Sequence, residues 1–522
     1  MKFEDFQNLV KAHPDSVVPV YRELLADTLT PVVAFLRIRS GGRPAFLLES
    51  VEGGESIGRY SFLGTDPFRS IRAFGSKVEV RSHSRGGEEE VVCREEKSFF
   101  RLIEEEIGRY RSVDVHGLPP FEGGAVGYIN YDSIRLIEKI PDSHPREDAL
   151  PDALFNFYEN LIAFDHARHR LLLIANVLPE VAGATADRDH RELWDEAQER
   201  LDGLEDLLTE RVDGEEWPGR IPELPPASIA TDMESNFSPE DFEKAVVRAK
   251  DYIAAGDAFQ IVLSQRFQRP VTVDAFEVYR VLRALNPSPY LFFLQLEDTA
   301  ILGSSPETLV RVEDRKVTVH PIAGTRPRGK TVEEDLALEK DLLADQKELA
   351  EHRMLVDLGR NDVGRVARFN TVKLTSYLTI ERYSHVMHIV SEVEGELRDG
   401  VSSLEAFEAG FPAGTVSGAP KIRAMEIIDE LEPTRRGVYA GAVGYLDFAG
   451  NLDTCIAIRT IVIHKGVARI QAGAGIVADS VPETEYMETV HKATALFEAL
   501  RLAEAGVARR EAQAGLGLGD AR

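Results

Sequence analysis

The sequence predicts a globular protein that mixes α-helices with β-strands in two large domains. The chain has 522 residues, of which 43% are hydrophobic, so it can bury a large core. Strand-like apolar runs bounded by turn residues alternate with amphipathic helical segments along the whole chain. A proline-rich polar stretch, residues 215–237, interrupts this pattern and predicts the linker between the domains.

The first half carries mostly strand signals after a helix at the N-terminus. A second helix is expected over residues 20–29, and two strands, 32–38 and 45–50, are expected to flank a glycine-containing turn. The later elements expected in this half are a strand-rich sheet over residues 58–82, helices over 99–110 and 187–212, and a hairpin over 152–177. The pentapeptide GAVGY occurs at 124–128 and again at 441–445, which two similar half-sheets or chance would explain.

The second half alternates helices and strands. Ser238 and Pro239 have the chemistry of a helix start, and residues 308–324 have the pattern of a hairpin. Residues 347–362 have helical periodicity, and Gly359 is expected to end that helix. The last residues, 506–522, are expected to form a disordered tail.

Two acidic helices could hold a divalent cation. Glu348 and Glu351 share one face of the helix over 347–362, and Glu485, Glu488 and Lys492 share a face of a helix near the C-terminus. Two such faces can hold Mg²⁺, which needs one or two carboxylates and takes its other ligands from water and substrate. Solvated faces with local ion pairs explain the same spacing, so the spacing alone leaves both interpretations open.

Charge and cysteine content exclude several classes of function. The net charge is −27, from 61 basic and 88 acidic residues, which argues against binding to nucleic acid or to anionic membranes. An anionic substrate would therefore need a locally positive site. The only cysteines, Cys93 and Cys455, indicate a reducing compartment, and no run approaches the roughly 20 apolar residues of a membrane span. A cytoplasmic location is expected.

Single residues give weaker signals. Arg459 lies in an apolar strand-like run, where an arginine needs a carboxylate partner or binds a carboxylate, and the functional interpretation is favoured. His388 and Tyr439 have the surroundings of core residues. Residues 411–421 resemble a phosphate loop but lack its Gly-Lys-Ser/Thr ending, and Pro420 removes a backbone donor. The glycines of residues 472–476 allow either close approach of an anion or a tight strand pair.

The ordered motifs together resemble a known family, the component I chains of anthranilate synthase among the chorismate-utilising enzymes. The motifs that carry the resemblance are LLES (47–50), GRYSFLG (58–64), GDAFQIVLSQRF (256–267), NPSPY (286–290), SSPE (304–307), PIAGTRPRG (321–329), ELAEHRMLVDLGRND (348–362), VMH (386–388), FPAGTVSGAPK (411–421), CIAIRT (455–460) and AGAGIVADS (472–480). The resemblance implies an α+β fold of layered antiparallel sheets flanked by helices. It places an N-terminal domain at 1–225 and a chorismate-binding catalytic domain at 226–505.

The resemblance also implies a set of site residues and a reaction. Chorismate and ammonia would give anthranilate and pyruvate, the first committed step of tryptophan biosynthesis. Mg²⁺ would be held by Glu351 and Glu488, with Glu348 and Glu485 supporting it through water. The residues implied for substrate binding and catalysis are Gln260, Glu307, His388, Thr415, Tyr439, Arg459, Gly473, Gly475 and Lys492.

Two positions indicate which nucleophile is used. Aminodeoxychorismate synthases resemble this chain but carry a nucleophilic lysine at the position of Ala323, and isochorismate synthases carry a water-activating lysine at the position of Gln260. Alanine cannot attack the ring, and glutamine can only orient a nucleophile. Ammonia is therefore the expected nucleophile, and aminodeoxychorismate synthase component I is the alternative.

A partner and an inhibitor follow from the same resemblance. Neither cysteine lies in a nucleophile-elbow context, so ammonia would come from a separate glutamine amidotransferase, anthranilate synthase component II. Tryptophan would inhibit from a second site. Its expected residues are Glu49, Ser50, Asn286, Pro287, Ser288, Pro289, Tyr290, Leu291 and Cys455. A non-catalytic regulator and a metal-dependent phosphoryl-transfer enzyme are the alternatives from other classes.

Overall fold

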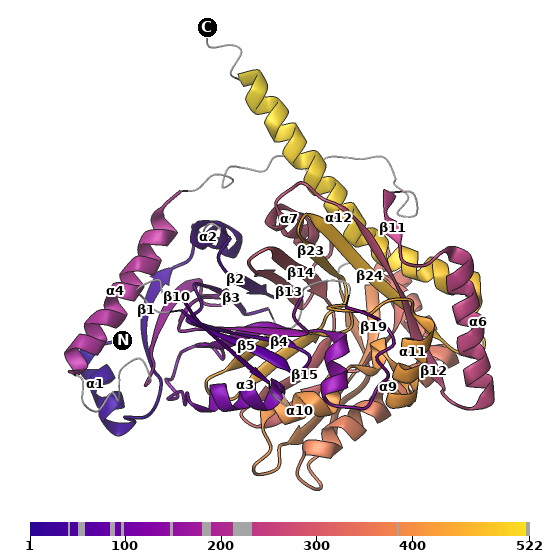
Figure 1. Ribbon diagram of the computed structural model, residues 1–522, viewed down its shortest axis with the longest axis horizontal. Helices are drawn as coiled ribbons and strands as arrows, with labels where there is room; N and C mark the ends of the chain where they lie inside the picture. Colours follow the sequence, from indigo (N-terminus) through magenta and orange to yellow (C-terminus); the bar gives the residue numbers. More distant parts are fainter. Residues whose placement is uncertain are drawn as a thin grey trace.

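Two large antiparallel β-sheets lie face to face, and helices cover their outer faces, in the computed structural model of the chain (Figure 1). The structure describes residues 1–39, 42–50, 58–83, 89–95, 99–146, 150–179, 189–211, 232–383 and 386–517. Apolar side chains from the inner faces of both sheets, such as Phe46 and Val126, pack together between them. The layered α+β fold implied by the motifs is confirmed.

Each sheet takes strands from both halves of the chain. In the first sheet the halves meet where β2 pairs with β13. Its strands in spatial order are β1 (Val18–Leu25), β10 (Arg170–Val177), β9 (Asn160–Asp165), β3 (Tyr60–Thr65), β2 (Ala45–Glu49), β13 (Tyr290–Gln295), β14 (Thr299–Ser305), β23 (Thr460–His464), β24 (Val467–Ile476), β12 (Gln260–Pro270) and β11 (Glu234–Ser235), with β20 (Gly418–Ala419) beside β12.

In the second sheet the two GAVGY segments lie side by side, because β7 pairs with β21 and Gly127 faces Gly444. On its other side Gly127 faces strand β8, where a Cβ atom on Gly127 would lie 1.8 Å from the Leu154 carbonyl oxygen. This close contact between β7 and β8 requires glycine. The strands in spatial order are β17 (Ile322–Pro327), β19 (Val386–Glu396), β16 (Lys316–Val319), β15 (Thr308–Glu313), β22 (Leu452–Ile456), β21 (Ala442–Asp447), β7 (Gly124–Ile129), β8 (Ala153–Tyr158), β4 (Arg69–Phe74), β5 (Lys77–His83) and β6 (Glu89–Glu95), with β18 (Lys373–Arg382) beside β19.

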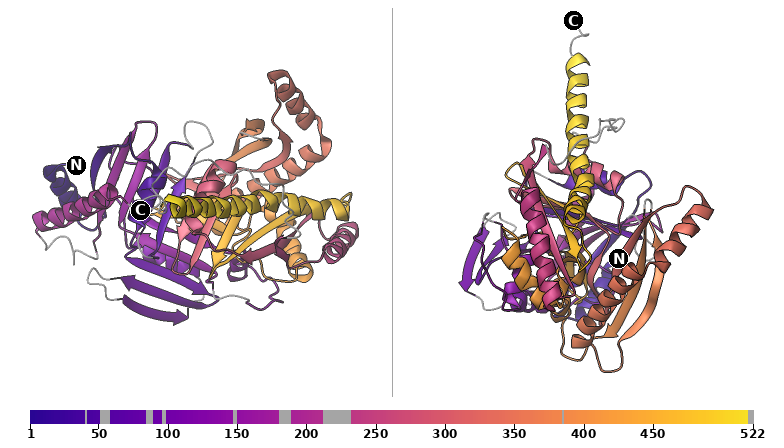
Figure 2. Two further views of the ribbon diagram at one scale, coloured as in Figure 1. Left: turned by 90° about the horizontal axis from the view of Figure 1, so that it is seen from above. Right: turned by 90° about the vertical axis from the view of Figure 1, so that its right-hand side faces the viewer.

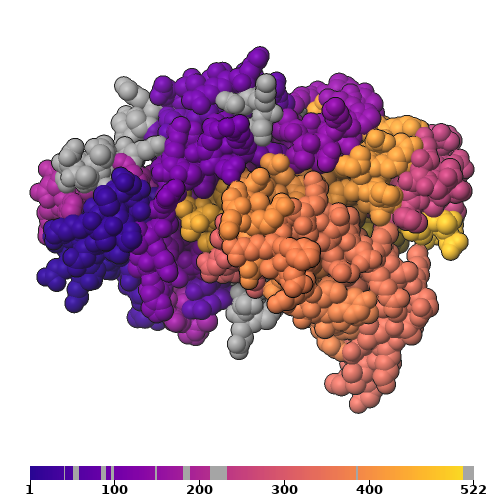
Figure 3. Space-filling view, turned by 90° about the horizontal axis from the view of Figure 1, so that it is seen from below, coloured from indigo at the N-terminus to yellow at the C-terminus, as the bar shows by residue number. Residues whose placement is uncertain are grey.

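Helices form the outer layers. Those packed on the first sheet are α1 (Phe3–Ala12), α2 (Pro31–Ile38), α4 (His190–Thr209), α7 (Ala275–Leu285) and α12 (Pro482–Gly517). Those packed on the second sheet are α3 (Phe99–Gly108), α9 (Gln346–Val366) and α10 (Ser403–Gly410). Two more, α6 (Pro239–Ala255) and α11 (Lys421–Leu431), pack beside β12. The salmon-coloured part of the chain that contains α8 (Val332–Ala344) projects from the body (Figure 3).

The local predictions for residues 20–29, 32–38 and Gly359 are wrong. Residues 20–29 contribute to strand β1 rather than a helix, and residues 32–38 lie in α2 rather than a strand. Thr30 caps α2, and Pro31 occupies its first turn, a helix-start signal that outweighed the β-branched residues behind it. Gly359 does not end α9 but lies inside it, where Val319 packs 3.1 Å from the position of a Cβ atom.

The predicted linker falls mostly on residues 212–231, outside the described residues, as do residues 518–522 at the end of the predicted tail. Because both sheets combine strands from the two sides of residue 226, the two halves share the hydrophobic cluster between the sheets. Helix α12 continues to Gly517, where a disordered tail is predicted, and its C-terminal part projects from the body (Figures 1 and 2). Within the described residues no helix is both long and apolar enough to span a membrane.

Candidate active site

Two crossings of the chain between the sheets form the centre of the site. Glu307 lies where the chain passes from β14 to β15, and Arg459 lies where it passes back from β22 to β23. The crossings bond to each other, because Ser304 N–H donates to the Arg459 carbonyl (3.1 Å) and Ile456 N–H donates to the Glu307 carbonyl (3.0 Å). The expected continuous strand around Arg459 is therefore wrong. Its left-handed backbone, φ 50°, marks strain that surrounding contacts must hold.

Glycines of β24 make room for two polar side chains. A Cβ atom on Gly475 would lie 2.5 Å from Nε2 of Gln260, and one on Gly473 would lie 2.7 Å from the hydroxyl of Tyr439. Strands β12 and β24 pair here, with Val262 opposite Gly475. These glycines, whose sequence allowed either an anion's approach or a tight strand pair, lie in the β12–β24 pair and make room for Gln260 and Tyr439.

The electrostatics of Glu307 show which side chains converge. Burial raises its pKa to about 7, while a hydrogen bond from Thr415 and the charges of Lys492 and Arg459 act in the opposite direction. Burial lowers the pKa of Arg459, and Glu307 opposes that effect. A carboxyl that is half protonated near neutral pH, between a hydroxyl and two cations, can donate a proton to a leaving group.

Carboxylates of α9 and α12 lie beside this centre. Gln260 Nε2 donates to Glu351 Oε1 at 3.1 Å, which connects α9 to β12. Burial raises the pKa of Glu348, and the negative charge of Glu351 raises it further. Like charges held together in a partly buried place favour a cation between or beside them.

The α12 face is anchored by Lys492. Its Nζ lies 2.7 Å from Glu488 and donates to the Gly473 carbonyl at 3.0 Å. Burial raises the pKa of Glu485, a Ser480 hydrogen bond opposes this, and Glu488 raises it further. The charge of Lys347 on α9 also acts on Glu485, so the two acidic helices lie near each other. Among the described residues no three His, Cys, Asp or Glu side chains cluster at metal-binding distance.

His388 lies on β19 at the edge of the site. Burial lowers its pKa, and the charge of Arg459 lowers it too, so the ring is neutral near pH 7. Its Nδ1 lies 3.0 Å from the Gly324 carbonyl and 3.1 Å from the Thr325 hydroxyl, which can accept as well as donate. Because a carbonyl only accepts, Nδ1 carries the proton and Nε2 remains a proton acceptor. The neighbouring residues in the sequence favoured a core role for His388, but the structure places it within reach of the charge of Arg459.

A second pocket, of about 120 Å³, lies between β2, β13 and β22. It contains the residues expected for tryptophan at Glu49, Ser50, Pro289, Tyr290, Leu291 and Cys455. It does not include Asn286, Pro287 or Ser288, whose turn instead bonds to Ser304 through Asn286 Nδ2 (3.0 Å) and Ser288 Oγ (3.3 Å).

Sequence reasoning missed a buried ion pair, Glu432 with Arg436, behind Tyr439. The spacing of four residues hinted at it, but both residues follow the end of α11, where helical spacing carries no weight. It also missed the role of Lys421, which donates to Asp362 and to the Gly410 carbonyl, both at 3.0 Å, and so ties the end of α10 to α9.

Comparisons with known proteins identify the family of the chain. A family model described as chorismate binding enzyme matches residues 43–498. Anthranilate synthase component 1 of Acetivibrio thermocellus is 45% identical over 508 residues, covering 96% of this chain and 98% of that one. The Pseudomonas putida protein of the same name is 46% identical over 490 residues, covering 93% and 96%.

Solved structures give the same result. Anthranilate synthase component I from Streptococcus pneumoniae TIGR4 superposes with a TM-score of 0.71 at 37% identity, covering 91% of this chain and 98% of that chain. The isochorismate synthase MenF of Escherichia coli shares the fold alone, with a TM-score of 0.65 at 19% identity over 96% of this chain and 100% of that one. The chain therefore belongs to the chorismate binding enzyme family, among the relatives named anthranilate synthase component 1.

Proposed function

We propose that this chain is the large subunit of an anthranilate synthase, which converts chorismate and ammonia to anthranilate and pyruvate in tryptophan biosynthesis. The observation that carries the proposal is the meeting of Glu307 and Arg459 at the two sheet crossings, with Thr415 and Lys492 acting on the same carboxyl. This cluster gives a dianionic substrate a positive, partly buried place within a chain of net charge −27.

The proposed roles follow from the chemistry of each group. Arg459 and the Tyr439 hydroxyl bind the enolpyruvyl carboxylate beside the backbone of Gly473 and Gly475. Thr415 and Lys492 line the same pocket. Glu307, with a pKa near 7, donates a proton to the ring hydroxyl as it leaves. The neutral His388 ring takes a ring proton at Nε2 as the aromatic product forms.

The proposed metal is Mg²⁺, held by Glu351 and Glu488, with Glu348 and Glu485 supporting it through water. The donor set fits, because it consists of carboxylates only and Mg²⁺ needs one or two of them beside water and substrate oxygens. The pKa values of Glu348 and Glu485, raised first by burial and further by Glu351 and Glu488, support a site that gains from added positive charge. When bound, the ion would neutralise and orient the ring carboxylate.

Ammonia is the proposed nucleophile. Ala323 on β17 supplies no amine, and Gln260 supplies no base, so neither a protein nucleophile nor an activated water is available at those positions. We propose that ammonia is delivered by a separate glutamine amidotransferase subunit. The relatives' designation as component 1 supports a partner component.

Tryptophan is the proposed ligand of the second pocket. Apolar walls from Leu291 and Cys455 suit an indole, and Ser50 Oγ is buried with no hydrogen-bond partner within the described part of the chain. Thr308, which lines this pocket, follows Glu307 directly and bonds the Tyr290 hydroxyl at 2.9 Å. A ligand in this pocket would contact Thr308, next to Glu307. Through this contact, tryptophan binding and chorismate binding would be coupled by about 1–3 kcal/mol.

A fluorescence assay tests the proposal. The purified chain with chorismate, Mg²⁺ and ammonium salt should form fluorescent anthranilate, whereas glutamine in place of ammonium should give none. Tryptophan should inhibit, and Ser50→Phe should relieve inhibition with little loss of turnover because it fills the pocket. An absence of anthranilate would refute the activity. Product from glutamine alone would refute the partner, and unchanged tryptophan affinity in Ser50→Phe would refute the second site.

A further inference from the structure

Arg436 is a buried arginine, 4% exposed, that lies behind the proposed substrate face. Its Nε and Nη2 donate to the two oxygens of Glu432 at 2.9 and 2.6 Å. Its remaining donors go to main-chain carbonyls, with Nη1 to Val416 at 2.6 Å and Nη2 to Val262 at 2.8 Å. One planar guanidinium therefore joins a carboxylate and two separate backbone segments.

Each of these backbone segments carries a residue of the site. Val416 follows Thr415 in the short 3₁₀ turn Gly414–Val416, and Val262 on β12 pairs with Gly475. The guanidinium carbon also lies 5.7 Å from the centre of the Tyr439 ring. Arg436 thus touches the supports of the Thr415 hydroxyl, the Gly475 backbone and the Tyr439 ring.

Glu432 completes the arrangement from the other side. Its Oε1 accepts from both N–H and Oγ of Ser264, each at 2.8 Å, and Ser264 pairs with Gly473. The pair therefore holds β12 at Val262 and Ser264, two residues apart along the strand. Charged hydrogen bonds of this kind are short and directional, so they set relative positions more tightly than apolar packing.

We propose that Arg436, paired with Glu432, is a positioning residue that sets the distance between the Thr415 turn, the β12–β24 glycines and the Tyr439 hydroxyl. The inference rests on the proposed function, because it takes those three groups to touch chorismate. Stability alone does not call for the pair, since a buried ion pair often contributes no more to folding than apolar side chains of the same size.

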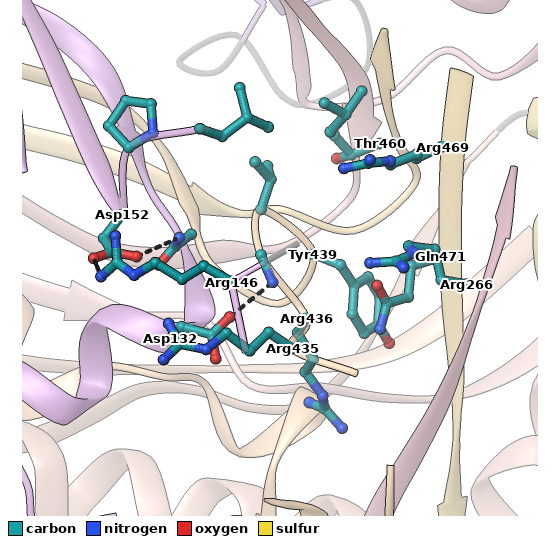
Figure 4. Close-up of a pocket in the computed structure, with 16 residues that line it drawn as sticks. Asp132, Arg146, Asp152, Arg266, Arg435, Arg436, Tyr439, Thr460, Arg469 and Gln471 are labelled. Carbon is teal, nitrogen blue, oxygen red and sulfur yellow. Dashed lines mark hydrogen bonds and ion pairs between the residues drawn. The ribbon is translucent and has the colours of Figure 1, made fainter. Parts of the chain in front are cut away.

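A cavity of about 70 Å³ reaches Arg436 (Figure 4). Arg436, Tyr439 and Gln471 line it together with Asp132 and Asp152. In Figure 4 Tyr439 lies beside Gln471 and Arg266, across the cavity from Arg146 and Asp152. Truncation of Arg436 would leave the Glu432 carboxylate without its guanidinium partner beside this cavity, and that carboxylate would attract a small cation.

The test compares Arg436→Ala, Arg436→Lys and the double variant Glu432→Gln with Arg436→Met. The control is Arg69→Met, which breaks a partly buried arginine–carboxylate pair between Arg69 on β4 and Glu106 on α3, away from the site. Circular dichroism melts establish that each variant is folded. Steady-state anthranilate formation from chorismate, Mg²⁺ and ammonium gives kcat and KM, and methylguanidinium at about 10 mM serves as the rescue probe.

We expect each folded Arg436 variant to lose about 100-fold in kcat/KM, since displacement of substrate-positioning groups by about 1 Å costs this much. Arg69→Met should stay within threefold of wild type at a similar melting temperature. Methylguanidinium should restore Arg436→Ala several-fold and saturably. It should not restore the double variant, in which methionine fills the space.

A readout independent of activity is hydrogen exchange at residues 414–417. It should quicken in the double variant and stay unchanged in Arg69→Met. Wild-type kcat/KM in any folded Arg436 variant, or unchanged exchange at 414–417, would overturn the proposal. The proposal would also be overturned if Arg69→Met lost as much activity as the Arg436 variants at the same melting temperature. If wild type itself makes no anthranilate, the proposed function fails, and the exchange result still decides the positioning claim.

Discussion

The glycine under Gln260 offers a sharp test of the site. In Gly475→Ala the new Cβ atom would lie 2.5 Å from Gln260 Nε2 and 3.5 Å from its Cδ. Normal carbon contacts are roughly 3.5–4.0 Å, so the amide must move by about 1 Å. The obstructing atom is the end of a flexible side chain, so the fold should survive. The 3.1 Å hydrogen bond from Gln260 to Glu351 should be lost.

The magnitude follows from that bond. A hydrogen bond to a charged group contributes about 1.5–3 kcal/mol, and each 1.36 kcal/mol is a factor of ten in rate, so kcat/KM should fall by about 10- to 150-fold. The control is Gly364→Ala on α9, the helix that carries Glu351, where a Cβ atom meets nothing within 4 Å. The assay is anthranilate fluorescence with ammonium, alongside thermal melts. Wild-type kcat/KM in Gly475→Ala would show that Gln260 does not act through Glu351.

Three further predictions follow from the same structure. Glu351→Gln should lower turnover at least 100-fold while the melt is unchanged, because it removes a charge from a hard-cation site; near-normal turnover at low Mg²⁺ would contradict the metal assignment. His388→Ala should reduce kcat more than chorismate affinity, measured by calorimetry, and weakened binding at unchanged turnover would exclude proton transfer. Burial raises the pKa of Glu122 from 4.5 to about 8, so the folded state holds its proton more tightly and stability from this group is lost as pH rises from about 4.5 to 8. Glu122→Gln should therefore have a higher melting temperature than wild type at pH 9 and the same melting temperature at pH 5. An equal difference in melting temperature at both pH values would refute this.

The sequence by itself determined the family and most local elements. Ordered motifs, the cap at Ser238 and the helical spacing of Glu348 with Glu351 are short-range signals, and α6 and α9 form where these signals lie. Local signals failed where they conflicted. In residues 32–38 the β-branched composition favoured a strand, but the Thr30 cap and Pro31 begin a helix that buries an apolar face against the first sheet.

Only the tertiary structure decided how the site is assembled. Glu307 and Arg459 are 152 positions apart by their numbers, and they meet because the chain changes sheets at each of them. The break in the strand at Arg459 has no local signal, since residues 455–463 read as one apolar run; the requirement to cross between sheets imposes the left-handed backbone there. The Arg436–Glu432 pair lay beyond sequence reasoning for the same reason. A buried charge is stable only where distant backbone carbonyls and a carboxylate meet it, and sequence spacing does not encode that meeting.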